Sequence, residues 1–399
     1  MAYFRSPRIL FGKGVLKRLA PEIQGWGTKA VLITGETTAK LSGQVVELVK
    51  SAGFEVKEWN GAKPEPSIDV AREGGKVLLE CKPELVIGFG GGSAIDTAKA
   101  AWILYARPDL EAGALHKAVT PKTQLNLRDK ASFIAIPTTS GTGSEVTWAG
   151  LLTDKENKRK IAFANNEIVP DVALLDPEFT VSMPRALTAS TGLDVLGHAF
   201  DGYTARQQTD FSDGLCLQAI EMCFDWLPKA CQDGDDLVAR EKMQNAAAIA
   251  GLGFGNSNTS LCHALAHSLG VNFSIPHGRA VGLALTYSLA YISSNPPLPN
   301  APDPVQRLAG VARLLGIAGG SEGAAIESLL ERIEDLKEEI GEPLSLKEEG
   351  ITETQMEENI DTLATSASKD VNMFSSPCEC SGEKLTELFR TMWFGRKHK

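Results

Sequence analysis

Two helix-spaced pairs of side chains and one further histidine are the residues of this sequence best suited to bind a metal. Asp194 and His198 lie four residues apart in TGLDVLGHAFDGY. His263 and His267 lie four apart in LCHALAHSLG, and His277 follows in IPHG. Residues four apart on an α-helix share one face, with Cβ atoms about 5–6 Å apart. Each residue alone could be an ordinary core or capping side chain. Together, on two helices, they predict a centre for a divalent transition metal such as Fe²⁺ or Zn²⁺, for which one carboxylate and three imidazoles are suitable ligands.

A glycine-rich turn in the first half has the composition of a phosphate-binding loop. The apolar run ELVIGF leads into GGGSAIDTAKA, so that Gly91, Gly92 and Ser93 join a strand to a helix. Glycine lets the backbone approach a ligand closely, and the N-terminus of a helix favours a phosphate. Asp96, just inside this helix, could favour the helix dipole or accept a hydrogen bond from a ribose or an amide. The turn lacks the first-turn GxGxxG fingerprint, so a plain Rossmann domain is not predicted.

A second loop, IPTTSGTGSEVT (136–147), gathers hydroxyl side chains around two glycines. Its hydroxyls are those of Thr138, Thr139, Ser140, Thr142, Ser144 and Thr147. Such a loop offers many hydrogen-bond donors to phosphate and ribose oxygens, although serine and threonine also cap helices. The two loops together favour a bound dinucleotide over a pair of tight turns.

The elements that must position these residues differ between the two halves of the chain. Apolar, strand-like runs at 9–12, 30–35, 84–92 and 132–139, with FEVKEWNG at 54–61, alternate with helical periods. This spacing predicts βαβ units and a parallel sheet. From Arg185 onward the apolar residues follow helical periods alone. At 399 residues we expect two domains: an α/β domain over 1–183 and an all-helical domain over 184–399, with the boundary near Met183-Pro184.

Composition excludes several classes of partner and location. The formal net charge of −10 argues against binding to nucleic acid or to an anionic membrane, because both need a basic face. No run of about 18 apolar residues predicts a membrane span, and the N-terminus lacks the apolar stretch of a signal peptide. The seven cysteines form no disulfide framework and are typical of reduced thiols. We therefore expect a cytoplasmic protein.

Five motifs, in this order and at this spacing, resemble those of the iron-containing (group III) alcohol dehydrogenases over essentially the whole chain. They are GGGSAIDTAKA, PTTSGTGSEVT, GLDVLGHAFDGY, HALAHSLG and IPHG. The resemblance implies a dehydroquinate synthase-like fold, with an α/β dinucleotide-binding domain followed by an all-α metal-binding and substrate domain. It also implies a metal-dependent, NAD(P)-linked alcohol dehydrogenase or aldehyde reductase. Such an oxidoreductase transfers hydride between nicotinamide C4 and the carbon of a small metal-bound alcohol or aldehyde.

The resemblance also assigns roles residue by residue. The metal ligands would be Asp194, His198, His263 and His277, with His267 a nearby proton relay or substrate-orienting residue. The pyrophosphate and nicotinamide end would be held by Gly91, Gly92, Ser93 and Asp96. The same cofactor would be lined by Thr138, Thr139, Thr142 and Thr147, and its ribose reached by Lys160. Phe254 falls where the family places an aromatic wall of the substrate pocket.

Two departures from the family pattern bear on specificity. Many NAD-specific members carry an Asp after the first core strand, where this chain has Gly35 in ITGETT. A glycine leaves room for a 2′-phosphate and favours NADP(H) over NAD(H), although Glu36 is adjacent and could still bind the ribose. Near the C-terminus SSPCECSG (375–382) replaces the frequent Asn-Pro-Arg, which puts the rim of the substrate pocket in question.

Several alternatives stay open at this point. A glycerol-dehydrogenase-like protein or a sugar-phosphate cyclase would share the fold, and a zinc hydrolase or lyase would share the ligand types. A non-catalytic protein would bind neither metal nor cofactor. The resemblance implies Fe²⁺, whereas Zn²⁺ binds such ligands more strongly. The substrate is a small molecule: a short primary alcohol, a diol, or an aldehyde carrying an acid or sulfonate. We expect a homodimer or higher homo-oligomer, in which the strand RILFG pairs across the interface.

Overall fold

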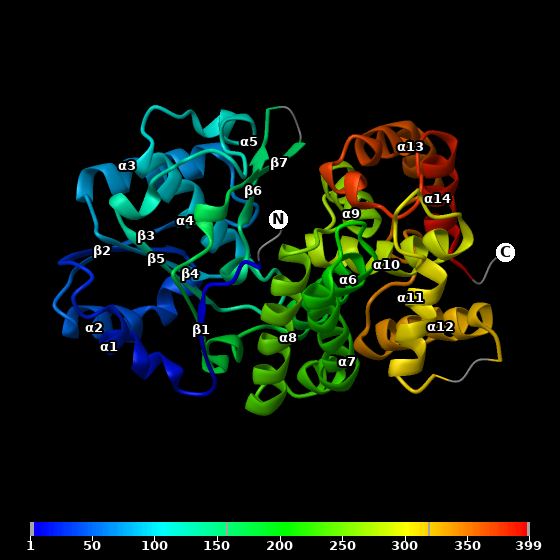
Figure 1. The fold of residues 1–399 in the computed structure, drawn as a ribbon, viewed down its shortest axis with the longest axis horizontal. Helices are drawn as coiled ribbons and strands as arrows, with labels where there is room; N and C mark the ends of the chain where they lie inside the picture. The colour runs from blue at the N-terminus through cyan, green and yellow to red at the C-terminus, as the bar shows by residue number, and fades with distance from the viewer. Residues whose placement is uncertain (1–3, 157–158, 318–319, 397–399) are drawn as a thin grey trace. The chain divides into compact units, whose positions relative to one another are not determined.

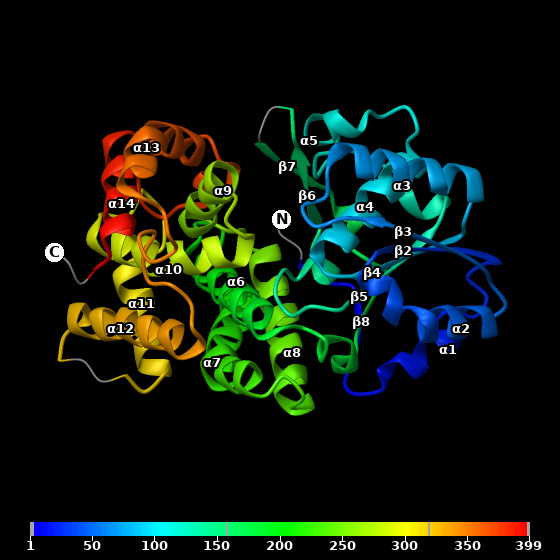
Figure 2. The same ribbon diagram turned by 180° about the vertical axis from the view of Figure 1, so that it is seen from behind.

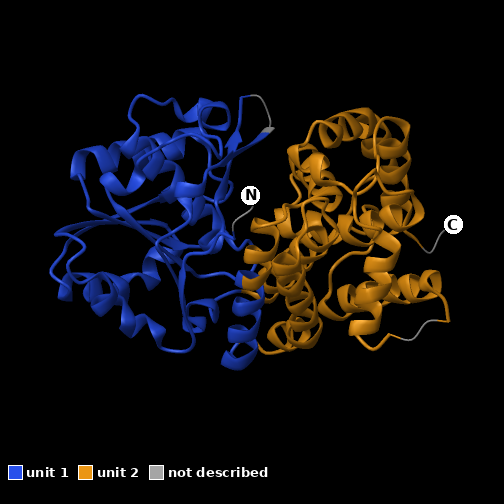
Figure 3. Ribbon diagram, viewed as in Figure 1, with its two compact units in different colours: residues 1–183, 235–248 blue, residues 184–234, 249–399 orange. Residues whose placement is uncertain are grey.

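The computed structural model describes residues 4–156, 159–317 and 320–396. Contacts divide the chain into two compact units, one of residues 1–183 and 235–248 and the other of residues 184–234 and 249–399 (Figure 3). Helix α8 (Leu237–Gly255) contributes to both units. Its first part therefore groups with the first unit, whereas the sequence pattern places it in the helical half. Among the residues described, no helix has the length and apolar character needed to cross a bilayer.

The first unit contains a six-stranded sheet with the order β1-β8-β5-β4-β2-β3. Every neighbouring pair in this sheet is parallel, which confirms the predicted parallel sheet. Its strands are β1 (Arg8–Phe11), β2 (Lys29–Gly35), β3 (Glu55–Ala62), β4 (Leu85–Gly90), β5 (Ser132–Pro137) and β8 (Val172–Leu175). The central strand β4 is buried along its whole length, as expected for a strand covered on both faces.

Helices cover both faces of this sheet (Figures 1 and 2). They are α1 (Leu19–Ile23), α2 (Gly43–Ser51), α3 (Ile68–Cys81), α4 (Gly92–Ala106) and the short α5 (Leu115–Ala118). Alternation along β2 separates two cores: Val31 and Ile33 pack with α3 and α4, whereas Ala30 and Leu32 pack with α1 and α2. The three layers place the N-terminus of α4 directly after β4, at the carboxyl edge of the sheet.

Two strand features differ from the sequence prediction. Strand β8 is a run of only four residues, too short to show a period, and it was not predicted. A separate antiparallel hairpin of β6 (Ala149–Asp154) and β7 (Arg159–Ala164) follows the threonine loop and was also missed. Strand β8 depends on neighbours far away in the chain, since it lies between β1 and β5.

The second unit is helical, as predicted. Its helices besides the end of α8 are α6 (Arg185–Thr204), α7 (Asp210–Gln232), α9 (Leu261–Phe273), α10 (His277–Ser294), α11 (Pro304–Leu314), α12 (Glu322–Ile340), α13 (Glu353–Ser368) and α14 (Glu383–Phe394). No strand is assigned to its described residues, although Pro297 and Cys378 form an isolated antiparallel bridge. Glycines bring α6 and α10 unusually close: a Cβ on Gly197 would lie 2.1 Å from Val281 Cγ1, and one on Gly282 would lie 2.5 Å from Leu193 Cδ1.

Candidate metal centre and cofactor loops

Four side chains from three helices of the second unit converge on one point. Asp194 and His198 lie one turn apart on α6, His263 lies on α9, and His277 is the first residue of α10. One potential ligand atom from each residue lies within 4.8 Å of the other three. Asp194 Oδ1 is 3.5 Å from His277 Nε2, 3.8 Å from His263 Nε2 and 3.9 Å from His198 Nδ1. These separations exceed hydrogen-bond length and leave a central space that all four groups face.

The hydrogen bonding of this cluster fits a bound cation. Asp194 and His263 are each only 2% exposed, yet Asp194 Oδ1 and His263 Nε2 have no hydrogen-bond partner. A buried polar atom left unpaired costs free energy, on the order of 1–3 kcal/mol. Two such atoms facing each other at 3.8 Å suggest that a third group belongs between them. A divalent metal with oxygen and nitrogen ligands satisfies both atoms.

The protonation states of the cluster depend on burial and on mutual charge. Burial acts to raise the pKa of Asp194, but His198, His277 and His263 outweigh it and hold that pKa well below its usual range. Partial burial and the neighbouring imidazoles lower the pKa of His277, against the opposing effect of Asp194, so this ring is neutral at pH 7. An ionised carboxylate and a neutral imidazole are the forms that bind a metal.

Asp201 holds His263 in place from behind. His263 Nδ1 lies 2.8 Å from Asp201 Oδ2, and the pKa of His263 rises to about 9 because Asp194 and Asp201 outweigh the opposing effect of burial. At pH 7 this ring therefore carries a proton that a bound metal would displace. Asp201 also accepts from the backbone N–H groups of Ser260 (2.8 Å) and His263 (3.1 Å). A carboxylate bonded to the far nitrogen of a metal-binding histidine is a common outer partner that sets its tautomer. The sequence motif contains Asp201, but only its contact with His263 reveals this role.

His267 lies beside the cluster without joining the four convergent groups. Its ring stacks on that of His277 with centroids 5.3 Å apart, and its Nε2 is buried without a hydrogen-bond partner. Its Nδ1 lies 2.8 Å from Oδ2 of Asp370, just before the 3₁₀ turn η8 (Val371–Ser375). Asp370, which sequence reasoning missed, lies 103 residues away along the chain. Only tertiary contact could identify it.

Two further predicted features of the second unit, Phe254 and segment 375–382, lie at different distances from the cluster. Phe254 stacks on the ring of His198, with centroids 4.1 Å apart, so it forms an aromatic wall at the cluster. Segment 375–382, which differs from the family's Asn-Pro-Arg, packs at the C-terminal end of α10. There Cys378 Sγ donates to the carbonyls of Ile292 and Asn295, each at 3.4 Å. The two carbonyls belong to residues 15 and 18 positions after His277, roughly 22–27 Å along the helix axis. Cys378 and its neighbours in this segment therefore lie away from the four convergent residues.

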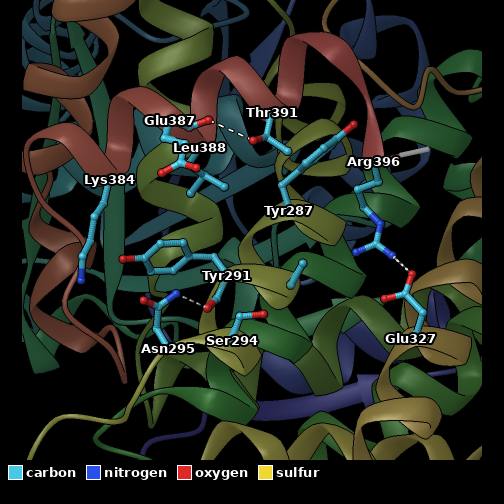
Figure 4. Close-up of a pocket in the computed structure, with 11 residues that line it drawn as sticks. Tyr287, Tyr291, Ser294, Asn295, Glu327, Lys384, Glu387, Leu388, Thr391 and Arg396 are labelled. Atoms are coloured by element: carbon cyan, nitrogen blue, oxygen red, sulfur yellow. Dashed lines mark hydrogen bonds and ion pairs between the residues drawn. The ribbon is translucent and has the colours of Figure 1, made fainter. Parts of the chain in front are cut away.

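A cavity in the second unit is separate from the cluster. It has a volume of about 510 Å³ and is lined mainly by α10 and α14 (Figure 4). One of its charged side chains, Arg396, forms ion pairs with Glu327 and with Glu334. None of the four convergent residues lines it.

In the first unit the glycine and threonine loops lie against each other. Gly91 caps α4 at its N-terminus, followed by Gly92 and Ser93, and Thr138 N donates to Gly90 O at 3.0 Å. A Cβ on Gly92 would lie 2.6 Å from both Cγ2 and Oγ1 of Thr142, and one on Gly91 would lie 3.3 Å from Thr139 Cγ2. The structure thus brings six of the predicted loop residues to one helix N-terminus. Backbone N–H groups and hydroxyls meet there, as phosphate binding requires.

Asp96 and Thr147 point into the packing beneath these loops. Asp96 accepts from the Ser144 hydroxyl and, at 2.9 Å, from Leu151 N. Thr147 Oγ1 accepts from Lys99 Nζ at 3.4 Å, and the Thr147 carbonyl accepts from the same amine at 2.8 Å. Through these hydrogen bonds, Asp96 and Thr147 hold the threonine loop against α4.

A buried charged cluster, which the sequence did not predict, supports this packing. Burial lowers the pKa of Lys99 to about 8, against the opposing effect of Asp96 and Glu145. Burial raises the pKa of Glu145, only 3% exposed, to about 7.

Gly35 and Lys160 lie at the borders of the loop region. Gly35 ends β2, where its N–H donates to Thr38 Oγ1 at 3.1 Å, and a Cβ on Gly90 would lie 3.3 Å from that same oxygen. A cavity of about 350 Å³ lies nearby and is lined by Lys40, Leu41, Gln44 and Phe179 among others. Lys160, on β7, donates to Thr153 Oγ1 at 3.0 Å and lies 3.5 Å from Glu65 Oε2.

Comparison with known proteins adds a family to this geometry. Residues 6–177 match a family model described as iron-containing alcohol dehydrogenase, and residues 188–393 match one described as the C-terminal part of the Fe-containing alcohol dehydrogenase family. The chain is 35% identical to the NADPH-dependent butanol dehydrogenase of Clostridium saccharobutylicum, over 99% of each protein. It is 30% identical to the NAD-dependent methanol dehydrogenase of Bacillus methanolicus, covering 97% of this chain and 98% of that one. The solved iron-containing alcohol dehydrogenase of Thermococcus thioreducens is 30% identical with a TM-score of 0.88, covering 99% of this chain and all of that one.

Proposed function

The chain belongs to the iron-containing alcohol dehydrogenase family, and we infer that it interconverts small alcohols and aldehydes with a nicotinamide cofactor. One observation supports this most strongly: a buried carboxylate and three imidazoles converge within 4.8 Å, with unpaired atoms that a metal would satisfy. We propose residues 184–399 as the metal-binding and substrate domain and residues 1–183 as the dinucleotide-binding domain.

The proposed metal ligands are Asp194, His198, His263 and His277. A bound divalent metal supplies Lewis-acid polarisation of the substrate oxygen. We propose Fe²⁺ as the resident ion on the strength of the family, with Zn²⁺ as the competitor that such ligands bind more tightly. Phe254, stacked on His198, offers an apolar wall to the substrate. That wall favours short alkyl alcohols and aldehydes over substrates bearing an acid or sulfonate group.

His267 and Asp370 are proposed to handle the proton of the reaction. Asp370, with its pKa lowered mainly by the hydrogen bond to His267 against the effect of burial, holds Nδ1 of that ring at 2.8 Å. This bond fixes the tautomer and leaves Nε2 to carry or receive a proton. A histidine oriented by a buried carboxylate is a recurring arrangement in acid–base catalysis.

The glycine and threonine loops are the proposed cofactor site. A bound nicotinamide cofactor carries the hydride, and the protein orients it. Gly91, Gly92 and Ser93 would hold the pyrophosphate at the α4 N-terminus, with hydroxyls from Thr138, Thr139 and Thr142 beside it. Asp96 and Thr147 would act by holding the loop, and Lys160 would reach a ribose.

NADP(H) is the proposed preference. Gly35 carries no side chain that could repel a 2′-phosphate, and the exposed Lys40 lines the neighbouring cavity. The NADPH dependence of the butanol dehydrogenase agrees with this preference, whereas the NAD dependence of the methanol dehydrogenase does not.

We further propose a homodimer and a cytoplasmic location. Strand β1 pairs with β8 at one edge of the sheet, and no described strand pairs with its other edge, which leaves backbone groups for a second copy. All seven cysteines are free thiols, which is typical of a reducing compartment.

The deciding experiment measures oxidation of NADH and of NADPH by a panel of small aldehydes, including acid and sulfonate members. Protein purified without oxygen is assayed with added Fe²⁺ in one arm and a chelator in the other. Turnover that needs Fe²⁺ and prefers NADPH with alkyl aldehydes is expected. Dinucleotide binding without turnover on any aldehyde would instead indicate a cyclase-like or glycerol-type enzyme. His263→Ala should lose metal and activity together, and full metal content in that variant would remove His263 from the ligand set.

A further inference from the structure

His277 differs from the other three convergent residues in how it is held. Its side chain is 35% exposed, whereas those of Asp194, His198 and His263 are almost fully buried. It also begins a helix, and the preceding residue, Pro276, provides no side-chain cap for α10. The first turn of α10 must be positioned by other contacts.

One side of that first turn packs directly on α6. A Cβ on Gly278 would lie 2.3 Å from the backbone carbonyl oxygen of Ser190, which precedes Asp194 by one helical turn. This approach sets how near α10 can come to α6. It does not by itself set the rotation of α10 about its axis.

A charged contact from another helix supplies the second constraint. Arg279 donates from Nε to Glu342 Oε2 at 3.1 Å and from Nη2 to Glu342 Oε1 at 3.3 Å. Its Nη1 lies 3.5 Å from Glu349 Oε2. A two-point bond between guanidinium and carboxylate restricts direction as well as distance. The Glu342 side chain is 2% exposed and that of Arg279 is 31% exposed, so the carboxylate end of the bond is shielded from water.

Glu342 is itself rigidly placed by the end of α12. Gly341 adopts a left-handed conformation with φ of +81°, and its N–H bonds to Glu338 O at 3.1 Å. The N–H of Glu342 bonds to Lys337 O at 2.8 Å, which completes a hydrogen-bonded helix stop. Lys337 Nζ is buried without a hydrogen-bond partner, and burial lowers the pKa of Lys337 to about 8 against the opposing effect of Glu334, Glu348 and Glu342. The lysine in turn offsets the buried charge of Glu342.

The same helix end also holds the start of α6. Arg185, the first residue of α6, donates to Glu339 O at 3.3 Å, and a Cβ on Gly341 would lie 3.2 Å from its Nη1. Cations at the C-terminus of a helix are stabilised by its dipole. Residues 339–342 thus contact the first turns of both α6 and α10, the two helices that carry three of the four convergent side chains.

We propose that Glu342 is a positioning residue for the metal centre: through Arg279 it sets the direction of His277 and so the affinity for the metal. The inference rests on the proposed function of the four convergent residues. It assigns to the end of α12 a role that neither the motifs nor the ligand geometry contains.

The test is a metal-affinity comparison made without relying on activity. Dissociation constants for Zn²⁺ are measured by competition with a chelator for wild type, Glu342→Gln, Arg279→Met and the double variant. Each single variant should bind the metal about tenfold more weakly, the range typical for loss of an outer partner. The double variant should bind no more weakly than the weaker single one, because both changes remove one bond. Absorption of the Co²⁺-loaded proteins reports directly whether His277 has left the ion.

A matched control and two contrary outcomes keep the interpretation clear. Glu357 makes a similar two-point bond to Arg390 between α13 and α14, so Glu357→Gln should leave the Zn²⁺ affinity unchanged. Wild type that binds no Zn²⁺ would remove the proposed function itself. Wild type that binds Zn²⁺ while folded Glu342→Gln shows the same affinity and Co²⁺ spectrum would overturn the role of Glu342. If Glu342→Gln does not fold, Glu342→Asp keeps the charge with a shorter reach. It should still bind metal more weakly than wild type, and equal binding would count against the proposal.

Discussion

His267 depends on a partner that its own helix cannot provide. The ring stacks on His277 from one turn beyond His263, but its orientation comes from Asp370, near the turn η8. The two histidines of α9 therefore have different proposed roles at the centre. His263 is oriented by Asp201 toward the ion, whereas His267 is oriented by Asp370 with its Nε2 left unpaired.

Asp370→Asn should slow turnover while leaving the metal in place. The amide keeps the shape of Asp370 but loses its charge, so it no longer selects the same tautomer of His267. We expect kcat to fall by about 10²–10⁴-fold, the usual contribution of a positioned acid or base, with KM changed far less. His267→Ala should behave in the same way. Metal content measured beside kcat decides, and loss of the ion from Asp370→Asn would show that the residue has a structural role.

Glu145 should make the first unit less stable as the pH rises. Its pKa is raised by burial to about 7, above its ordinary value near 4.5, so between these values the folded state holds a proton that the unfolded state releases. The unfolding free energy therefore falls across this window, on the order of 3 kcal/mol for a shift of this size.

Glu145→Gln should remove that part of the pH dependence. Urea unfolding at several pH values from 4.5 to 8 measures the effect, with Glu178→Gln, an exposed glutamate, as a control that should follow wild type. If the unfolding free energy changes with pH equally in wild type and in Glu145→Gln, the prediction is wrong.

At the level of elements, the distance between α6 and α10 decides whether four ligand atoms can meet. Gly197, Gly278 and Gly282 allow that distance, because a side chain at any of them would overlap the facing helix. At Gly197 and Gly282 the overlap would be with side chains, which can move. At Gly278 it would be with the backbone carbonyl of Ser190, which cannot move without the helix.

Gly278→Ala should therefore weaken metal binding more than an ordinary glycine substitution in a helix. The added Cβ would lie 2.3 Å from Ser190 O, so α10 has to shift away and carry His277 with it. We expect at least tenfold weaker Zn²⁺ binding, as for other displaced ligand supports. Gly214→Ala on α7 is the control, because its Cβ would meet nothing within 4 Å. Unchanged affinity in folded Gly278→Ala would show that the helices tolerate a wider separation.

At the level of the whole molecule, each proposed site is built within one compact unit. The four convergent residues all belong to the unit of residues 184–234 and 249–399, and the glycine and threonine loops belong to the other. Ligands should therefore stabilise the two units separately.

Hydrogen exchange with each ligand in turn tests this separation. Zn²⁺ at about 100 times its Kd should stabilise the state that binds it by about 2.7 kcal/mol and slow exchange in α6, α9 and α10. NADPH should instead slow exchange at the start of α4 and in residues 136–147. Protection of the glycine loop by Zn²⁺ alone, or of α9 by NADPH alone, would mean that one unit responds directly to the ligand of the other.

Patterns that are local in the chain can be predicted from the sequence. Residues four apart on a helix must share a face, so the spacing alone identifies the pairs in α6 and α9. The glycine loop and the change from alternating to helical elements are equally local. These signals depend on backbone geometry over a few residues. They predict the fold class and indicate residues that could bind a metal or a phosphate, whereas the role of each residue was inferred from the resemblance to the family.

Only the tertiary structure decided which distant groups support those residues. Strand β8 is too short to show a pattern and forms between β1 and β5, and Asp370, Lys99 and Glu342 resemble any other charged residue in the sequence. Their roles come from contacts such as Asp370 with His267, across 103 residues. A single charged side chain has no period and no motif, and the energy that gives it a role arises only when burial removes water and a partner takes its place.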